Sequence, residues 1–469
     1  MIIKEIYKNY QELLDKNIQI NGWVITARSQ KEFTFIKVLD GSHPEGIQII
    51  VEGDSTKYST GMSVMIEGLL IKSPAKGQLF EVKSEKIKIL GQCDTNDYPL
   101  SKSGMSLDYL RKYCHLRART STFGSVFRIK SAISHATHSF FAMKNYLHLD
   151  PNILTINECE GGAGVFQVTE RDISIPGKLP LKMEEVLENN RPVKKPTELY
   201  DWSSDHFKNP VYLTVSSQLQ LEAISCALGS VYTTNKSFRS EHSSTNKHLS
   251  EFTHLEIESC FLTLDDLMTV GEEYIKYVGN YILTNNIEDV DNLGKFVSKG
   301  LKERITGIIE ANFNRISYDE AIKIAQEKGM KIVYGDDLSS EIENCLTEHF
   351  NNNPVFVFNW PMMIKSFYMK QDESNPNLCN NFDLLMPYKV GELIGGSMRE
   401  DNYDKLIAMM KIKGVSEEPM KFYTDLRKFG SVPHGGFGLG FDRMTMLFTS
   451  MENIKDTIPF PVYYGHCDY

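Results

Sequence analysis

The chain has 469 residues, of which 41% are hydrophobic and 24% are charged, and this is the composition of an ordinary globular protein with a large core. Its formal net charge of −10 argues against a protein that coats nucleic acid non-specifically, so nucleic acid would have to bind to local patches. The sequence contains no long apolar run, no apolar signal segment and no zinc-finger spacing among its eight cysteines. We therefore expect no membrane span and no zinc, and the scattered cysteines fit a reducing, cytoplasmic compartment.

Residues 1–98 are predicted to form a small β-barrel. Between residues 18 and 92, five alternating or β-branched segments are separated by turn segments such as GSHPEG and KSPAKG. Five short strands preceded by a short helix are typical of a closed barrel of the OB type, although a β-sandwich would show the same pattern. Residues 99–118 follow as a linker with one or two helical turns.

Residues 119–469 are predicted to form an α+β domain, because helices and strands mix without a regular βαβ alternation. Residues 126–146 and 264–286 have helical patterns, and Thr263 is a suitable N-cap for the second of these helices. Residues 285–350 are richly charged and predict a helical insertion. This mixture favours an antiparallel sheet over a doubly wound fold.

A strand with one charged face is predicted within FRSEHSSTNKHLSEFTHLEIE, residues 238–258. The second half of this segment alternates, so that apolar residues such as Leu255 face one way. The opposite face carries an aromatic ring, an imidazole and two carboxylates, on Phe252, His254, Glu256 and Glu258. A surface loop can be as polar as this segment, but the even spacing favours a strand that directs its charge into a site.

Glycines dominate PHGGFGLGFDRMTMLF, residues 433–448. Too few residues follow them for the βαβ unit that a dinucleotide fingerprint opens, whereas glycines two apart in a strand allow another group to approach the backbone. Arg443, at the start of the helix that follows, suits a phosphate or an adenine ring. In VGELIGGSMRE, Glu392 and Arg399 flank two glycines, although a kinked strand with solvated ends would look the same. Together these segments could bind a magnesium nucleotide on an antiparallel sheet without a P-loop.

The segment FRSEHSSTNKHLSEF is similar to motif 2 of the class II aminoacyl-tRNA synthetases, and GFGLGFDR is similar to motif 3. With its barrel, the chain resembles subclass IIb, the aspartyl, asparaginyl and lysyl enzymes, and most of all the bacterial asparaginyl-tRNA synthetases. The resemblance extends to segments such as NECEGGAGVF, LTVSSQLQLE and NIKDTIPFP. It implies an OB-fold anticodon-binding domain at 1–98, a hinge at 99–118 and a class II catalytic domain at 119–469, whose antiparallel sheet is flanked by helices.

The resemblance also implies roles for individual residues. The residues expected to bind ATP are Arg239, Glu241, His248, Phe252, Glu392 and Arg443. Among them, Arg239, Glu392 and Arg443 would be catalytic, and Glu392 would bind Mg²⁺. The residues expected to bind the amino acid are Glu160 and Gln218, at its ammonium group, and Glu256 and Arg399, at its side chain. The residues expected to contact the tRNA anticodon are Arg28, Phe35 and Gln48. An aromatic ring can stack on an unpaired base, although Phe35 could equally belong to the barrel core.

The implied reaction has two steps: the carboxylate of L-asparagine attacks the α-phosphorus of ATP, and the acyl group then passes to the 3′ end of tRNA-Asn. Aspartyl enzymes carry Lys where this chain has Leu221, so a substrate side-chain carboxylate would meet no matching cation. Arg399 could donate to the amide oxygen of asparagine, and Glu256 could accept from its nitrogen. This pair favours asparagine, because an unpaired buried charge costs several kcal/mol.

Some positions depart from the family pattern, namely Ser240, His242, Ser244, Lys247 and Val462. Motif 1, at about residues 126–155, would join two chains as a homodimer, and it too departs from the pattern, with Asp150 before Pro151. Two alternatives remain open. One is an aspartyl-tRNA synthetase that also charges tRNA-Asn, against which Leu221 argues. The other is a paralogue that binds RNA or makes asparagine without charging tRNA, although such relatives lack the barrel.

Overall fold

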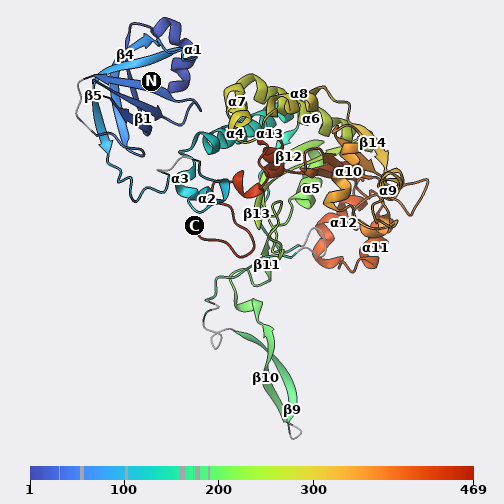
Figure 1. The fold of residues 1–469 in the computed structure, drawn as a ribbon. Helices are drawn as coiled ribbons and strands as arrows, with labels where there is room; N and C mark the ends of the chain where they lie inside the picture. The colour runs from blue at the N-terminus through green and yellow to red at the C-terminus, as the bar shows by residue number, and fades with distance from the viewer. Residues whose placement is uncertain are drawn as a thin grey trace.

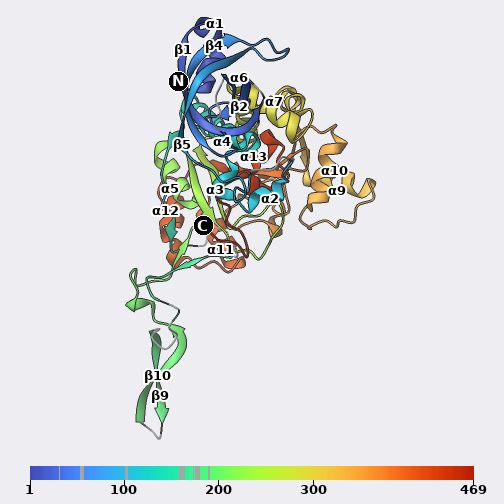
Figure 2. The ribbon, with the colours of Figure 1, turned by 60° about the vertical axis from the view of Figure 1, so that its left-hand side comes forward.

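The computed structural model describes residues 1–30, 32–52, 57–100, 104–157, 164–172, 174, 180–188 and 191–469. These residues form a small barrel and a larger body built on an eight-stranded sheet, and a long hairpin projects from the body (Figure 1; Figure 2). None of the helices within these ranges has both the length and the apolar character that a membrane crossing requires.

The barrel confirms the predicted OB-type fold and excludes the β-sandwich alternative. Its five strands close in the order β1-β2-β3-β5-β4. The strands are β1 Asn17–Ser29, β2 Phe33–Leu39, β3 Ile47–Glu52, β4 Ser63–Lys72 and β5 Phe80–Gly91, and helix α1 spans Ile3–Leu13. Alternate residues point inward, so that Ile18, Ile20 and Val24 of β1 pack in a closed apolar core.

The linker contains the expected short helices, α2 (Leu107–Arg111) and α3 (Cys114–Arg117). Arg111 and Arg117 both bind the buried carboxylate of Asp456 near the C-terminus, with N···O distances of 2.6 and 3.3 Å. Because two guanidinium groups share one buried carboxylate, the second half of the linker is held against the body.

The body is built on one sheet with the strand order β14-β15-β16-β17-β18-β13-β12-β6. The strands are β6 Leu147–His148, β12 Ser230–Phe238, β13 Glu251–Cys260, β14 Asn314–Ser317, β15 Val355–Phe358, β16 Asn381–Met386, β17 Gly391–Met398 and β18 His434–Gly440. All pairs from β15 to β12 are antiparallel, which confirms the predicted α+β class. The short edge strands β14 and β6 pair in parallel.

Helices cover both faces of this sheet (Figure 1). One apolar cluster joins the sheet to α4 Ser121–Met143, α6 Leu264–Asn285, α7 Ile287–Phe296, α8 Leu301–Glu310 and α13 Phe441–Thr449. A second cluster involves α5 Gln218–Leu228, α9 Tyr318–Glu327, α10 Ser340–His349, α11 Tyr403–Ile412 and α12 Lys421–Lys428. Phe356 of β15 packs in the first cluster and its neighbours Val355 and Val357 pack in the second, so the two clusters lie on opposite faces.

The helices α4 and α6 confirm the helical patterns at 126–146 and 264–286. Thr263 begins α6 in a capping box, in which its hydroxyl accepts from the Asp266 amide and the Asp266 carboxylate accepts from the Thr263 amide. The segment predicted as a helical insertion contains helices α7 to α10, but it also contributes β14. A four-residue strand is too short to show a period of two, and it forms here because β15 lies beside it.

The hairpin of β9 (Leu181–Glu188) and β10 (Arg191–Tyr200) projects away from the body in both views and was not predicted (Figure 1; Figure 2). A small sheet near its base has the order β7-β11-β8. These strands are β7 Leu154–Thr155, β8 Gln167–Val168 and β11 Val211–Leu213. Single 3₁₀ turns span Trp202–Ser204, Met362–Ile364, Glu418–Met420 and Ile454–Asp456.

Strand β18 lies between β13 and β17, and its glycines let these neighbours approach closely. A Cβ atom on Gly436 would lie 2.0 Å from the carbonyl oxygen of Ile257 and 2.4 Å from the carboxyl carbon of Glu258. The carbonyl oxygen belongs to the backbone of β13, so it cannot turn away from an added methyl group as a flexible side chain could. Gly436 is therefore required for the packing of this sheet.

We expect Gly436→Ala to lower the free energy of unfolding by about 3 kcal/mol, because the sheet must shift to admit the methyl group. Gly294→Ala is a matched control, since no atom lies within 4 Å of its added Cβ and the residue lies within helix α7. That control should be neutral or should stabilise by up to about 1 kcal/mol. Denaturant unfolding of both variants measures the difference, and equal stabilities would contradict the close approach at Gly436.

Candidate active site

Strand β13 carries the predicted charged face. Leu255 and Ile257 are fully buried in the core below the sheet. The polar residues lie on the opposite face, where His254, Glu256 and Glu258 stand opposite Gly440, Gly438 and Gly436 of β18. Directly opposed residues share a face of the sheet, so these glycines leave room for the polar side chains.

A cavity of about 320 Å³ opens above this face. Its lining includes every residue that we expected to bind ATP, namely Arg239, Glu241, His248, Phe252, Glu392 and Arg443. Gly438 and Gly440 form part of its floor. Residues more than 200 positions apart in the chain thus meet around one space, which has the size and polarity to hold a nucleotide.

Contacts within the cavity already orient several of these side chains. The guanidinium group of Arg239 lies over the ring of Phe252, 5.5 Å from the ring centroid. Arg443 donates through Nη1 to the carbonyl oxygen of Glu392 at 2.7 Å. His248 Nε2 lies 3.9 Å from a carboxylate oxygen of Glu241. Burial lowers the pKa of His248 despite this carboxylate, so at neutral pH the ring tends toward its uncharged form.

The residues around Glu392 fit a magnesium ion. A Cβ atom on Gly395 would lie 3.2 Å from a carboxylate oxygen of Glu392 and 3.5 Å from one of Asp383, so both carboxylates lie over this glycine. Mg²⁺ prefers oxygen ligands and usually takes one or two protein carboxylates together with substrate phosphates.

Asp383 was missed by the sequence analysis, although one acid within the apolar strand NFDLLM could have indicated it. It forms an ion pair with Lys365 at 2.9 Å. Burial and the neighbouring Glu392 raise the pKa of Asp383 to about 6, even though Lys365 opposes this effect. Its carboxylate is therefore poised to gain a cation.

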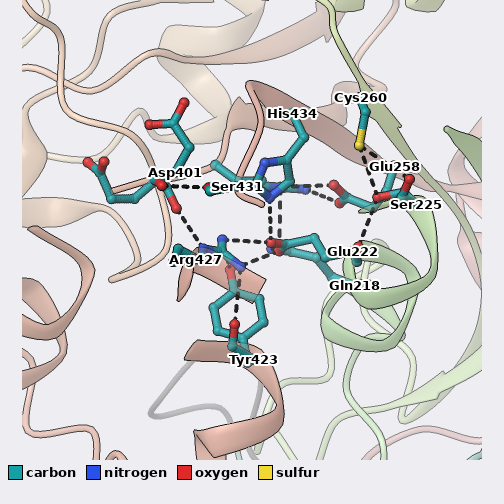
Figure 3. Close-up of polar contacts among 12 residues, drawn as sticks. Gln218, Glu222, Ser225, Glu258, Cys260, Asp401, Tyr423, Arg427, Ser431 and His434 are labelled. Atoms are coloured by element: carbon teal, nitrogen blue, oxygen red, sulfur yellow. Dashed lines mark hydrogen bonds and ion pairs between the residues drawn. The ribbon is translucent and has the colours of Figure 1, made fainter. Parts of the chain in front are cut away.

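Gln218 and Arg399, two of the predicted amino-acid-binding residues, lie beyond the cavity in a buried polar cluster, of which Figure 3 labels Gln218. Glu160 lies outside the described residues. Gln218 begins α5 and donates to Glu222 Oε1 at 3.0 Å. Arg399 follows β17 directly, and its Nε lies 3.8 Å from the same oxygen of Glu222. Gln218 and Arg399 thus meet at Glu222, a residue to which the sequence analysis gave no role.

Arg399 has a different carboxylate partner from the one expected beside it. Its guanidinium group donates to both oxygens of Glu258, from Nε at 3.2 Å and from Nη2, and to the hydroxyl of Ser397 at 2.7 Å. Glu256 instead accepts from the Ser217 amide, at 2.9 Å, and from the Ser216 hydroxyl at the start of α5. The strand register explains why Arg399 meets Glu258 and not Glu256. Ser397, Gly436 and Glu258 form one row across the sheet, and Arg399 lies two residues after Ser397.

Glu222 is the centre of the cluster (Figure 3). Besides Gln218, its carboxylate accepts from Tyr423 at 3.0 Å, from Arg427 at 2.9 Å and from His434 at 3.2 Å. Burial alone would raise the pKa of Glu222, but Arg427 and His434 outweigh it and hold the pKa well below the usual range. Glu258 accepts hydrogen bonds from fewer side chains than Glu222 does, and burial raises its pKa to about 7. The polar residues Gln218, Glu222 and Ser225 form a stripe along an otherwise apolar helix, and this stripe could have indicated the cluster.

The three predicted anticodon residues share one outer face of the barrel. Phe35 pairs with Arg28 across β1 and β2, and Lys37, two residues further along β2, pairs with Gln48 of β3. Phe35 is half-buried and lies outside the apolar core, which its neighbour Ile36 enters. The alternative that Phe35 belongs to the barrel core is therefore wrong, and its ring is accessible to a ligand.

The positions that depart from the family pattern lie in different environments. Lys247 lines the cavity, next to Glu392. Ser240 donates to the carbonyl oxygen of Val165 at 3.3 Å, and His242 stacks on Tyr464 with ring centroids 4.8 Å apart. The lysine is thus the departure that changes the lining of the cavity.

Known proteins with similar sequences and structures identify the family. Residues 106–463 match the family model described as tRNA synthetases class II (D, K and N). The chain is 40% identical to the asparagine–tRNA ligase of Protochlamydia amoebophila, over 97% of this chain and 96% of that protein. It is 39% identical to the asparagine–tRNA ligase of Clostridium tetani, over 100% of this chain and 99% of that protein.

Among solved structures, the chain is similar to asparaginyl-tRNA synthetase from Pyrococcus horikoshii complexed with asparaginyl-adenylate. The TM-score is 0.84 and the sequence identity is 31%, over 100% of this chain and 99% of that one. The motif residues gathered on one glycine-floored sheet agree with these matches. The chain therefore belongs to the class II tRNA synthetases of the D, K and N group.

Proposed function

We propose that this chain is an asparagine–tRNA ligase, which activates L-asparagine with ATP and transfers it to the 3′ end of tRNA-Asn. One observation carries this proposal. The polar face of β13 runs from Phe252 in the cavity to Glu258, which binds Arg399 in the buried cluster. A nucleotide and a small amino acid can therefore lie side by side on one strand, as adenylate formation requires.

In the first step, the substrate carboxylate attacks the α-phosphorus and pyrophosphate leaves. Because the substrate is its own nucleophile, the protein has to position two anions and stabilise the charge that develops. Arg239 binds the α-phosphate and the substrate carboxylate, Phe252 and Arg443 hold the adenine between them, and Glu241 accepts from its amino group. Glu392, together with Asp383, would hold Mg²⁺, which would supply positive charge to offset that of the phosphate oxygens.

The side chain of the substrate meets Arg399, which can donate to an amide oxygen. Arg399 has five N–H groups, and three of them serve Glu258 and Ser397 among the described residues, so two remain for a ligand. Glu256 accepts from the amide nitrogen. Leu221, fully buried on α5, offers no cation to a carboxylate. These features support asparagine over aspartate.

The tRNA lies across both parts of the molecule and brings its anticodon to Arg28, Phe35 and Gln48. The enzyme acts in the cytoplasm, where ATP and tRNA are available.

The enzyme acts as a homodimer through the region of β6 and β7, where Leu147, Leu154 and Ile156 are exposed. Because β6 is the edge strand of the main sheet, a second copy can cover these apolar side chains by a two-fold contact.

ATP–pyrophosphate exchange, run separately with asparagine and with aspartate, tests the proposed reaction. Asparagine should support exchange, and aspartate should support it at least about 100-fold less well, because its carboxylate finds no unpaired cation. Leu221→Lys should shift the ratio toward aspartate. Equal rates with both amino acids would instead identify an aspartyl enzyme without discrimination, and no exchange with either would favour a paralogue that does not charge tRNA.

Phe35→Ala tests the anticodon face. Loss of one stacking platform costs roughly 1–3 kcal/mol, so kcat/KM for aminoacylation should fall by about 5- to 150-fold. Pyrophosphate exchange and the melting temperature should stay near wild type, since the ring lies outside the core. Leu79→Ala, which removes an exposed apolar side chain elsewhere on the barrel, is the matched control and should change neither assay. Unchanged aminoacylation in Phe35→Ala would move the anticodon away from this face.

Sedimentation at micromolar concentration tests the dimer. The main species should have twice the 53.5 kDa mass of the monomer. Leu147→Asp places a charge on the exposed edge strand and should shift the protein toward monomer, because burying that charge is costly. A wild-type monomer with full activity would refute this part of the proposal.

A further inference from the structure

The two carboxylate oxygens of Asp383 have different surroundings. Oδ2 accepts from the ammonium group of Lys365 at 2.9 Å. Oδ1 is the oxygen that lies over Gly395, 3.5 Å from the position of an added Cβ atom, and Glu392 Oε1 lies 3.2 Å from the same position. Because Lys365 binds one oxygen, the carboxylate is held against rotation, and the other oxygen stays on the side of Glu392.

Lys365 is itself held in place by an aromatic ring. Its Nζ lies 3.7 Å from the centroid of the Trp360 ring. Trp360 is fully buried, and its Nε1 donates to the carbonyl oxygen of Val357 at 3.0 Å, so the indole cannot swing aside. The face of an aromatic ring attracts a cation but carries no net charge. The positive charge of Lys365 is therefore left to act on the carboxylates beside it.

Lys365 and its partner are largely shielded from water. Only 15% of the Lys365 side chain and 13% of the Asp383 side chain are exposed. Charges in such a place are screened little, so the ammonium group repels any second cation that approaches. One cation faces the two carboxylates of Asp383 and Glu392, and half of the negative charge that a metal ion would meet is thus already neutralised.

We propose that Lys365 keeps the Mg²⁺ site weak until the nucleotide binds. Its ammonium group occupies one oxygen of Asp383 and opposes a free metal ion, so Mg²⁺ would bind tightly only when the phosphates of ATP add their own charge and oxygen ligands. Lys365 is thus a positioning residue that acts through Asp383. This inference rests on the proposed function, to which it adds the order in which metal and nucleotide bind.

Lys365→Met is the direct test, because it removes the charge and keeps an unbranched side chain against Trp360. Mn²⁺, which shares the preference of Mg²⁺ for oxygen ligands, is titrated into the nucleotide-free enzyme at pH 8, and its electron paramagnetic resonance signal reports the free ion. The Kd for Mn²⁺ should fall at least about fivefold relative to wild type. An unchanged or higher Kd in the folded variant would overturn the inference.

Lys276→Met is the matched control. Lys276 also pairs with a carboxylate, that of Glu272 at 2.7 Å, and its Nζ also lies near an aromatic ring, 5.3 Å from the centroid of Phe313. It belongs to α6 and lies outside the cavity lining that the structure describes. This variant should keep the Kd for Mn²⁺ within about twofold of wild type. A fall as large as in Lys365→Met would reveal a general effect of charge and would overturn the inference.

A double variant shows whether the tighter binding occurs at this site. Lys365→Met with Asp383→Asn removes one charge of each sign, so the Kd for Mn²⁺ should return to within about threefold of wild type. A Kd as low as in Lys365→Met alone would place the ion elsewhere and would overturn the inference.

The wild-type enzyme gives a measurement that does not depend on the folding of any variant. Without nucleotide, its Kd for Mn²⁺ should be weaker than about 0.1 mM, and a tighter Kd would overturn the inference. These titrations need neither amino acid nor tRNA. If wild type supports exchange with asparagine and Lys365→Met leaves the Kd unchanged, the inference fails alone. If wild type supports exchange with neither amino acid, the proposed function fails first.

Discussion

The site depends on a strand whose glycines, Gly436, Gly438 and Gly440, leave most of one face without side chains. Strand β18 lies between β13 and β17, and a Cβ atom on Gly438 would lie 2.5 Å from His254 Nε2. One on Gly436 would lie 2.4 Å from the carboxyl carbon of Glu258. Because these positions are glycines, the charged side chains of both neighbouring strands can meet above β18. The cavity floor and the Arg399–Glu258 pair are consequences of this one constraint.

The same constraint explains why so many charges can be buried behind the cavity. Burying ionised groups costs several kcal/mol each unless they are paired with good geometry, and here each carboxylate has guanidinium, imidazole or hydroxyl donors. An apolar cluster of the same volume would stabilise the fold at least as well. We propose that the chain keeps this network for ligand recognition, because its hydrogen bonds fix the orientation of Arg399.

The parts of the fold with a clear period or cap were predictable, and those set by distant partners were not. The barrel strands, the polar face of β13 and the capped helix α6 follow from local patterns in the chain. Glu222 and Asp383 were missed, because the charged partners that give each acid its role, Arg427 and His434 for Glu222 and Lys365 for Asp383, are distant in sequence. Arg399, which is expected at the substrate side chain, lies in the buried polar cluster, and its bond to Glu258 comes from strand register across β18, which no local pattern contains.

The central claim is that one continuous sheet face holds a nucleotide and a neutral amino-acid side chain together. A crystal structure with a sulfamoyl analogue of asparaginyl-adenylate tests it most directly. The account predicts adenine between Phe252 and Arg443, the sulfamoyl group within hydrogen-bond reach of Arg239, and the side-chain amide within reach of Arg399. An analogue bound with its amide away from Arg399, or outside the cavity above β18, would contradict the account.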